Sequence, residues 1–301
     1  MALRAAALLV LAVMSTSCGF KSEPIGSLPQ FPQSASDALD RKVIVQEAPR
    51  RIVSLDPGMT EAAFDIGVGR LLVGGTGTET FPAQATKLRP MLNGQGKPNL
   101  RAIGKANPDL VLVPKTLAQT QADADRIARR LGIEVYVSDR ESVKGIEHDI
   151  LQLGLLTGHG SQARGLFTSM QNRIKTITTP FAGQDPVPVF VDRGYFYTIP
   201  GDGLAANLIG LAGGMNVAEN ADVSTPLTPA ELRQAAPQVY LAVAGSGVTL
   251  QGLRRSPATR SLPAVRHKRF TVLPDAVFMR SGPRVVDSLQ AIAQAIHPEG
   301  K

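Results

Sequence analysis

Cysteine is almost absent from this sequence of 301 residues, in which Cys18 is the only one. A single thiol forms no internal disulfide and cannot hold an iron–sulfur cluster, so both kinds of site are excluded. Histidine is also rare, and no two histidines stand at the spacing of a metal-binding pair. No metal ligand is therefore expected among the four, which are His148, His159, His267 and His297.

Aromatic residues are scarce as well, since the chain has no tryptophan and four tyrosines. A binding site in this protein thus has few rings for stacking on a ligand. The sequence contains neither a G-x-S-x-G nucleophile motif nor a Walker A phosphate-binding loop, and we identify no catalytic residue. Residues 158–163 match the dinucleotide pattern G-x-G-x-x-A, but they follow a predicted helix instead of a strand. We interpret them as a helix break.

Acidic residues are outnumbered by basic ones, 25 against 32, which gives a formal charge of +7 at pH 7. Nucleic-acid binding is one explanation, but no basic run is interleaved with aromatic residues, so no nucleic-acid partner is expected. A basic surface also suits anionic small molecules or an anionic cell envelope. The basic residues are scattered except for one cluster, made of Arg254, Arg255, Arg260, Arg266, Lys268 and Arg269.

The first residues have the pattern of an export signal. Arg4 supplies a short positive region, residues 5–14 are apolar but too few to span a bilayer, and small residues precede Cys18. A lone cysteine at this place resembles the acylation site of a bacterial lipoprotein, although Ser15 stands where that motif prefers an aliphatic residue. We predict a signal peptide over 1–17, lipid attachment at Cys18 and a cell-envelope location, with ordinary secretion as the alternative.

Residues 18–48 are rich in serine, proline and polar residues without apolar periodicity, so a tether is expected there, with order beginning at Arg50. Further on, residues 161–178 carry apolar residues at steps of three and four, which predicts an amphipathic helix. The same phrase flanks this helix on both sides: a helix, then Ala-x-Pro and a polar residue, then a buried strand, at 100–113 and at 231–243. We read two related lobes, 49–158 and 181–301, joined by a helix within 159–180.

Strands and helices alternate in both lobes, which predicts an α/β fold of two Rossmann-like lobes with parallel sheets and a ligand cleft between them. Ligands of such sheets meet the loops at the carboxyl ends of the strands, and in the first lobe these loops begin at Asp56, Gly75 and Pro114. A helix capped by Thr116 and ending at Leu131 is also expected. Glu61 lies early in a helix, where stabilisation of the helix N-terminus is its expected role.

Six phrases of the chain resemble the bacterial periplasmic-binding-protein family for ferric siderophores, haem and vitamin B12. They occur in the family's order and are distributed along the chain from Arg50 to Glu299: RIVSLDPGMTEAAFDIG, RAIGKANPDLVLV, LLTGHGSQA, GLAGGMN, AELRQAAPQVYL and SGPRVVDSLQAIAQAIHPE. The resemblance implies two lobes joined by a rigid helix and a metal chelate bound between them. It also implies a binding protein and not an enzyme, which delivers its ligand to a membrane permease driven by an ATPase.

One departure from the family concerns delivery. Members that dock on a permease usually carry a surface glutamate in each lobe, seven residues before the proline of the repeated phrase. Here those positions are Arg101 and Ala230, with Glu231 beside the second. In the family, this glutamate pairs with an arginine of the permease. Because like charges across an interface repel, either the permease of this protein differs from that pattern or this protein does not deliver a ligand in the usual way. The alternative is an envelope interaction module that keeps the fold without transport.

Seven residues are predicted to contact the ligand. Arginine forks match carboxylate geometry, and the resemblance places an arginine at the Arg280 position near the ligand. A tyrosinate can ligate ferric haem, and an aromatic ring can stack on a porphyrin. The alternatives are that the arginines are solvated at the surface, that Arg284 has a structural role, and that the tyrosines are buried at strand ends. The predicted residues are Arg193, Tyr195, Tyr197, Arg280 and Arg284 in the second lobe and Thr78 and Phe81 in the first.

The first lobe offers no tyrosine or histidine in the loop of Thr78 and Phe81, which counts against iron ligation from that side. An anionic chelate suits an arginine-bearing cleft, so a ferric siderophore is the first choice, haem the second and cobalamin the third. We expect no resident cofactor, and we expect the protein to be a monomer.

Overall fold

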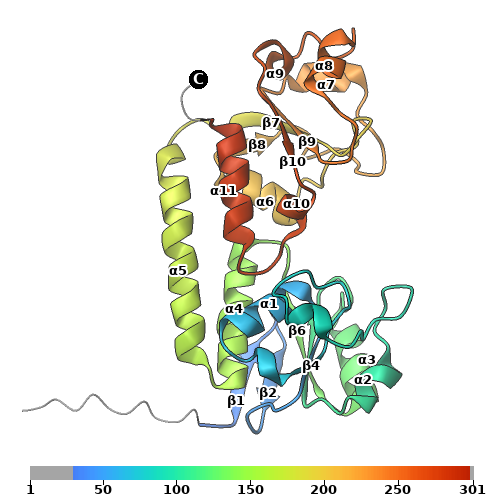
Figure 1. Ribbon diagram of the computed structural model, residues 1–301, viewed down its shortest axis with the longest axis vertical. Coiled ribbons are helices and arrows are strands. Elements are labelled where there is room, and N and C mark those ends of the chain that lie inside the picture. Colours follow the sequence, from blue (N-terminus) through green and yellow to red (C-terminus); the bar gives the residue numbers. More distant parts are fainter. Residues whose placement is uncertain (1–29, 299–301) are drawn as a thin grey trace, which may run out of the picture.

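The computed structural model describes residues 30–298, which form two lobes, each built on a four-stranded parallel sheet (Figure 1). The predicted α/β architecture is confirmed. Among these residues no helix is both long and apolar enough to cross a lipid bilayer. The signal peptide over 1–17 and the lipid site at Cys18 lie outside the described residues.

The sheet of the N-terminal lobe has the strand order β4-β3-β5-β6, with all neighbours parallel. Its central strand β5 is buried along its whole length, as expected of a strand covered by helices on both faces. The strands are β3 (Ile52–Ser54), β4 (Leu72–Gly74), β5 (Leu110–Pro114) and β6 (Glu134–Ser138). The helices of this lobe are α1 (Pro57–Asp65), α2 (Leu100–Lys105), α3 (Gln121–Leu131) and α4 (Val143–Thr157), with short 3₁₀ turns at Gly69–Leu71 and Ala85–Lys87.

Helix α3 starts later than predicted. Its N-cap is Thr120 and not Thr116, because Thr120 and Asp123 form a reciprocal capping box. The Thr120 side chain accepts from the Asp123 amide, and the Asp123 carboxylate accepts from the Thr120 amide.

The tether prediction is wrong for residues 33–45, which fold as an antiparallel hairpin of β1 (Gln33–Ser36) and β2 (Lys42–Val45). The hairpin is fixed by Arg41, whose guanidinium donates to Asp37 and to the carbonyl of Val135 in β6. The Ala38 amide also donates to the carbonyl of Val137, at 2.9 Å. The N-terminal lobe therefore begins before residue 49, on two strands of four residues each, which are too short to establish a period.

The sheet of the C-terminal lobe has the order β10-β9-β7-β8, again parallel throughout. Its short edge strand β8 carries no strand pattern and is absent from the sequence prediction. The strands are β7 (Val187–Asp192), β8 (Gly214–Asn216), β9 (Val239–Val243) and β10 (Phe270–Leu273). The helices are α6 (Gly203–Leu211), α7 (Pro229–Ala235), α8 (Leu250–Arg255), α9 (Pro263–Arg266), α10 (Ala276–Met279) and α11 (Val285–Ile296).

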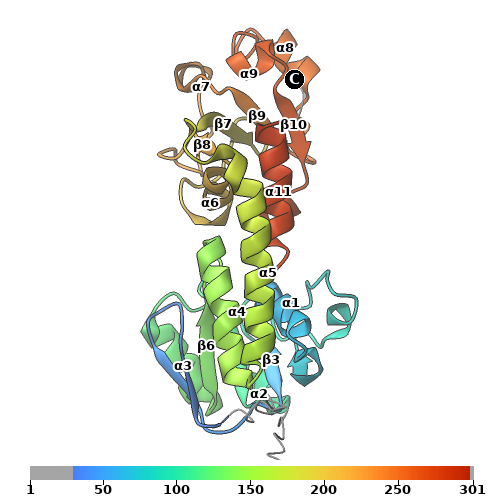
Figure 2. The same cartoon turned by 90° about the vertical axis from the view of Figure 1, so that its left-hand side faces the viewer.

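A single long helix, α5 (Gly160–Thr178), follows α4 and runs along both lobes to a 3₁₀ turn at Thr179–Phe181 (Figures 1 and 2). It lies against α4 of the first lobe and α11 of the second. The periodicity of residues 161–178 thus predicts this helix to within one residue.

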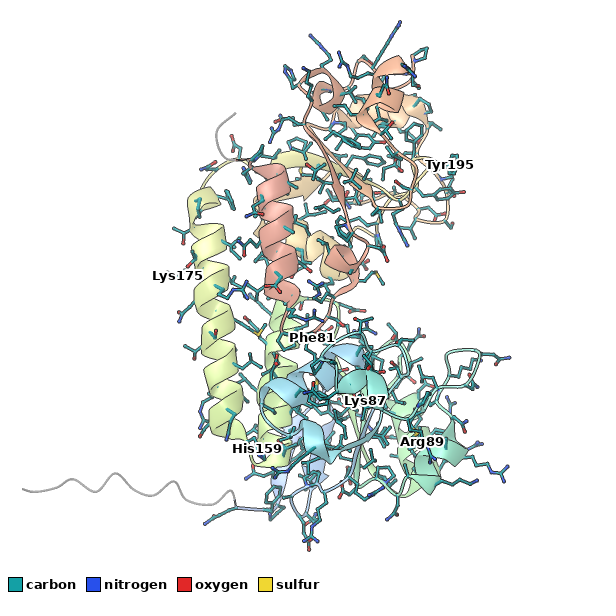
Figure 3. The ribbon with its side chains drawn as sticks, in the orientation of Figure 1. Phe81, Lys87, Arg89, His159, Lys175 and Tyr195 are labelled. Carbon is teal, nitrogen blue, oxygen red and sulfur yellow. The ribbon has the colours of Figure 1, made fainter. Side chains whose placement is uncertain are left out.

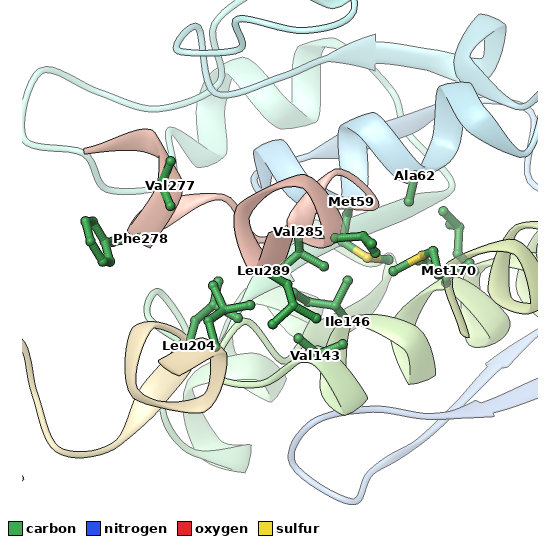
Figure 4. Close-up of a cluster of buried hydrophobic side chains, with 14 of the residues drawn as sticks. Met59, Ala62, Val143, Ile146, Met170, Leu204, Val277, Phe278, Val285 and Leu289 are labelled. Carbon is green, nitrogen blue, oxygen red and sulfur yellow. The ribbon is translucent and has the colours of Figure 1, made fainter. Parts of the chain in front are cut away.

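One hydrophobic core continues from the first lobe into the second through these helices. Met59 and Ile146 of the N-terminal lobe share it with Leu204, Val285 and Leu289 of the C-terminal lobe (Figure 4). Because close-packed interiors resist deformation, the two lobes are expected to move little against each other.

Candidate ligand-binding cleft

The candidate site is a cleft of about 260 Å³ where the two lobes meet. Its volume lies just below the roughly 300–1,000 Å³ typical of small-molecule sites, so a large chelate would fill it and extend outward between the lobes. The lining residues are Pro57, Gly58, Glu61, Thr78, Thr80, Phe81 and Arg140 from the N-terminal lobe, and Ala276, Met279, Arg280, Ser281, Gly282 and Arg284 from the C-terminal lobe.

Four of the seven predicted ligand residues line this cleft: Thr78, Phe81, Arg280 and Arg284. They come from the loop after β4 in one lobe and from the segment between α10 and α11 in the other. The structure therefore brings these four residues together, and their contact with a ligand stays a prediction.

Arg193, Tyr195 and Tyr197 are not among the residues that line the cleft. They follow β7 in a turn held by Asp192, whose carboxylate accepts from the amides of Gly194 and Phe196. Tyr195 is 86% exposed, and Figure 3 places it on the side of the C-terminal lobe away from α5, whereas Phe81 lies where the lobes meet.

Arg140 is the principal cleft residue that sequence reasoning missed. It follows the carboxyl end of β6. Ligands of parallel sheets meet the loops at the carboxyl ends of the strands, and this rule, which located Thr78, would also have located Arg140. The Arg140 Nε atom donates to the Ser281 hydroxyl at 2.9 Å and lies 3.7 Å from a carboxylate oxygen of Asp56. Arg140 therefore ties the two lobes together as it lines the cleft.

The first-lobe loop is preorganised by Glu79. Its carboxylate is buried and accepts from the amide of Thr76 at 2.6 Å and from that of Gly77 at 2.8 Å. The hydroxyls of Thr76 and Thr78 are hydrogen-bonded to each other at 2.8 Å. The loop thus presents Thr78 and Phe81 from a fixed backbone.

Asp56 holds the first turn of α1 at the base of the cleft. Its carboxylate accepts from the Gly58 amide at 2.8 Å, as an N-cap, and from the Ser138 hydroxyl at 2.6 Å. Both partners are buried. This network fixes the position of α1 relative to the end of β6.

The strongest polar contact between the lobes joins Glu61 of α1 to Arg284, the residue before α11. The Glu61 carboxylate accepts from the Arg284 amide at 2.8 Å and from Nε at 2.9 Å, and Nη2 lies 2.8 Å from Oε2. Glu61 is the fifth residue of α1, beyond its first turn, so the expected role at its own helix N-terminus is wrong. The carboxylate instead meets the N-terminus of α11, where a negative charge is favourable.

Arg284 contacts the N-terminal lobe a second time, because its guanidinium lies 3.8 Å from the centre of the Phe81 ring. This is the geometry of a cation–π contact. With its charge paired by Glu61 and stacked on Phe81, Arg284 holds the lobes together at the cleft.

Arg280 differs from the other cleft arginines. It is half-buried, and no ion pair or side-chain hydrogen bond of Arg280 occurs within the part of the chain described, 30–298. The cleft lining carries three arginines against one carboxylate, Glu61. The net charge of the lining is therefore positive, and Arg280 is its uncompensated member.

A further acid below the cleft, Asp149, adds little negative charge to it. Asp149 lines a small internal space with Asp56, Gly58 and Ser281. Burial raises the pKa of Asp149 to about 8, although hydrogen bonds from the Tyr136 hydroxyl and the Asp139 amide act to lower it. Burial likewise raises the pKa of Tyr136. Below about pH 8, the Asp149 carboxyl is thus mostly protonated and does not repel an anion in the cleft.

Breaking the contact between Glu61 and Arg284 is expected to destabilise the protein. Arg284→Gln should lower the free energy of unfolding by about 2 kcal/mol, since Glu61 is 4% exposed and loses its charged partner, while Arg284 at 31% is partly screened by water. Urea unfolding of Glu61→Gln, Arg284→Gln and the double variant should give a coupling energy of about 1–3 kcal/mol.

The matched control for this cycle is the pair of Arg173 in α5 and Asp287 in α11. Its N–O distance is 2.7 Å, but both side chains are about half exposed, at 49% and 46%. Arg173→Gln and Asp287→Asn should couple by less than about 1 kcal/mol. Equal coupling in the two cycles would contradict a special role for the pair at the cleft.

The two positions of the predicted permease contact are equivalent in the structure. Arg101 and Ala230 are each the second residue of a helix, α2 and α7, and both are exposed. Glu231 does not replace the missing carboxylate freely, because its Oε2 accepts from the amide and hydroxyl of Thr228 in a capping box. These hydrogen bonds, first that of the Thr228 amide, lower the pKa of Glu231.

No cluster of three or more histidine, cysteine, aspartate or glutamate side chains suited to a metal ion occurs in residues 30–298. His297 has other contacts: its ring stacks on Phe181 with 4.0 Å between the ring centroids, and its Nε2 lies 3.0 Å from the Ala212 carbonyl.

A family model described as periplasmic binding protein matches residues 52–277. The uncharacterized ABC transporter substrate-binding lipoprotein YvrC of Bacillus subtilis (strain 168) is 27% identical, over 98% of this chain and 96% of its own length. A vitamin B12-binding protein of Photorhabdus laumondii is 28% identical, over 84% of this chain and 90% of its own.

Among solved structures, the periplasmic vitamin B12 binding protein BtuF of Vibrio cholerae superimposes with a TM-score of 0.69. The alignment covers 82% of this chain and 96% of BtuF, at 22% sequence identity. This similarity confirms the two-lobe fold with its long joining helix.

Proposed function

The chain belongs to the periplasmic binding protein family, whose members are binding proteins and not enzymes, and from this premise we propose that it binds an anionic metal chelate in the interlobe cleft for an ABC importer. A ferric siderophore is the first candidate. The observation that carries the proposal is Arg280, a half-buried cation without a protein counter-charge at the meeting point of two rigid lobes. A ligand carboxylate or deprotonated hydroxyl supplies the missing partner.

Shape and charge would share the work of recognition. Thr78 and Phe81 offer a hydroxyl and one ring from the first lobe, and Met279 adds an exposed flexible apolar surface from the second. With one aromatic side chain in the lining, stacking contributes little, so charge pairing has to supply most of the specificity.

Cobalamin is a second candidate, supported by the vitamin B12-binding relative of Photorhabdus laumondii. Haem, the second choice from the sequence, becomes the third candidate. Its carboxylates would suit Arg280, but the tyrosines proposed as iron ligands, Tyr195 and Tyr197, belong to a loop outside the cleft lining.

Delivery to a permease is the second part of the proposal, supported by the relative YvrC, which carries the name of an ABC transporter lipoprotein. Lipid attachment at Cys18 would keep the protein at the membrane of the cell envelope. Arg101 and Ala230 make the docking face neutral to basic at the two positions where family members carry glutamate. The permease we propose thus presents acidic or uncharged residues there.

The proposal is tested by absorbance titration of the chain produced without residues 1–18, which keeps every described residue, against ferric siderophores, cobalamin and haemin. We expect saturable binding of one anionic siderophore. A Soret shift lost in Tyr195→Ala or Tyr197→Ala would make the protein a haem binder instead, and saturation by cobalamin alone would favour the second candidate. No binding across the set would leave the interaction-module alternative.

A further inference from the structure

The end of the C-terminal lobe carries a surface that the ligand cleft does not use. Between Glu231 and Asp275 the sequence has no acidic residue, yet it has seven lysines and arginines. Six of these are exposed, and we call them the basic tip: Arg233, Arg254, Arg255, Arg260, Arg266 and Lys268.

The fold gathers the basic tip at one end of the molecule. Its residues belong to α7, α8, α9 and the turns around them, which lie together at the end of the C-terminal lobe in both views (Figures 1 and 2). Arg233 of α7 donates to the carbonyl of Ala258, which links α7 to the turn after α8. Beneath these elements a separate cluster of buried residues, including Leu232, Leu253 and Val265, holds them as one platform.

None of the six cations forms an ion pair within residues 30–298. Arg269, the seventh basic residue of the stretch, differs because it is half-buried and its guanidinium donates to the Ile296 carbonyl. The positive charge of the basic tip is thus uncompensated by the protein, and it is available to an anionic partner.

We propose that the basic tip is a contact site for anionic lipid headgroups on the membrane surface. Two features favour a lipid surface over a protein partner. The cations are spread over three helices and the turns around them, and none is paired with a carboxylate among residues 30–298, which suits the diffuse charge of a bilayer. Long, flexible lysine and arginine side chains also adapt to headgroups without a fixed geometry.

The position of the basic tip gives this contact a consequence. The tip and strand β1, where the described chain begins, lie at opposite ends of the molecule (Figure 1). With the predicted lipid at Cys18 ahead of β1, the protein would be held at both ends and lie lengthwise on the membrane. A lipid chain and a polybasic surface are the two signals that together give stable anchoring.

The test is sedimentation of the chain without residues 1–18 with vesicles of phosphatidylcholine and phosphatidylglycerol, and with vesicles of phosphatidylcholine alone. We expect binding to the anionic vesicles only, weakening as salt is added. Neutralising three cations in Arg254→Gln, Arg255→Gln, Arg260→Gln should weaken partitioning on the order of 100-fold.

The matched control is Lys105→Gln, Arg129→Gln, Arg130→Gln in the N-terminal lobe. These residues are also exposed and lie in the last turns of helices, as Arg254 and Arg255 do, and the change in net charge is the same. The control variant should bind anionic vesicles as the parent does. An equal loss of vesicle binding in both variants would show that binding depends only on net charge, and it would contradict a specific site at the basic tip.

Absence of binding by the parent at low salt would also overturn the proposal. Crosslinking of the basic tip to an acidic membrane protein, lost in the Arg254, Arg255, Arg260 variant, would then assign it to a protein partner. Ligand titration in solution tests the cleft separately and involves none of these residues.

Discussion

Gly58→Ala is expected to weaken ligand binding between about tenfold and 100-fold and to lower stability by about 1–3 kcal/mol. A β-carbon at Gly58 would lie 2.3 Å from the carbonyl oxygen of Ser281 and 2.7 Å from its carbon, both backbone atoms of the other lobe. The backbone of Gly58 is compatible with alanine, and helix propensity favours alanine by about 1 kcal/mol. Any loss of stability or affinity in Gly58→Ala is therefore caused by the clash between the lobes.

The clash acts on the cleft because Gly58 and Ser281 both line it. Separating them moves Arg280 away from Thr78 and pulls on the contact between Glu61 and Arg284. The variant is assessed by urea unfolding and by ligand titration. Gly104→Ala in α2 is the control, since a β-carbon there meets nothing within 4 Å, and it should be neutral or stabilising. Normal binding by Gly58→Ala would mean that the lobe contact does not define the site.

Arg280→Gln is expected to weaken binding of an anionic chelate about 100-fold, because a charge-assisted hydrogen bond in a partly buried site is lost. Stability should change little, since Arg280 forms no ion pair among the described residues. The measurement is an absorbance titration with the chelate that binds the parent, supported by urea unfolding of both proteins.

Arg193→Gln provides the matched control for Arg280→Gln, with the same chemical change in a loop of the same lobe. Arg193 does not line the cleft, so its variant should bind with nearly the affinity of the parent. The opposite result, loss of binding in Arg193→Gln and none in Arg280→Gln, would move the ligand to the loop of Tyr195 and Tyr197.

The architecture was predictable because its signals are local. The apolar period of residues 161–178 located α5, and the repeated Ala-x-Pro phrase located the two lobes. Strand β8 and the β1-β2 hairpin were missed because each strand has only three or four residues, too few to establish a period. Their stability comes from packing on the rest of each lobe, which short sequence windows do not reveal.

The cleft was predictable in part for the same reason. Carboxyl-end loops pointed to Thr78, Phe81 and Arg280, and the same rule applied to the loop after β6 would have found Arg140. The pairing of Glu61 with Arg284 joins residues 223 positions apart, and no local sequence pattern predicts it. The exposed position of Tyr195 likewise depends on how the turn after β7 is folded, where both Tyr195 and Phe196 have positive φ.

The most direct test of the account is a crystal structure of the chain with the chelate that saturates it in solution. We predict the ligand between Thr78 and Phe81 on one side and Arg280 on the other, with Glu61 and Arg284 still paired. A structure with the interlobe cleft empty and the ligand in another cavity, such as the one between α7 and residues 217–228, would contradict this prediction.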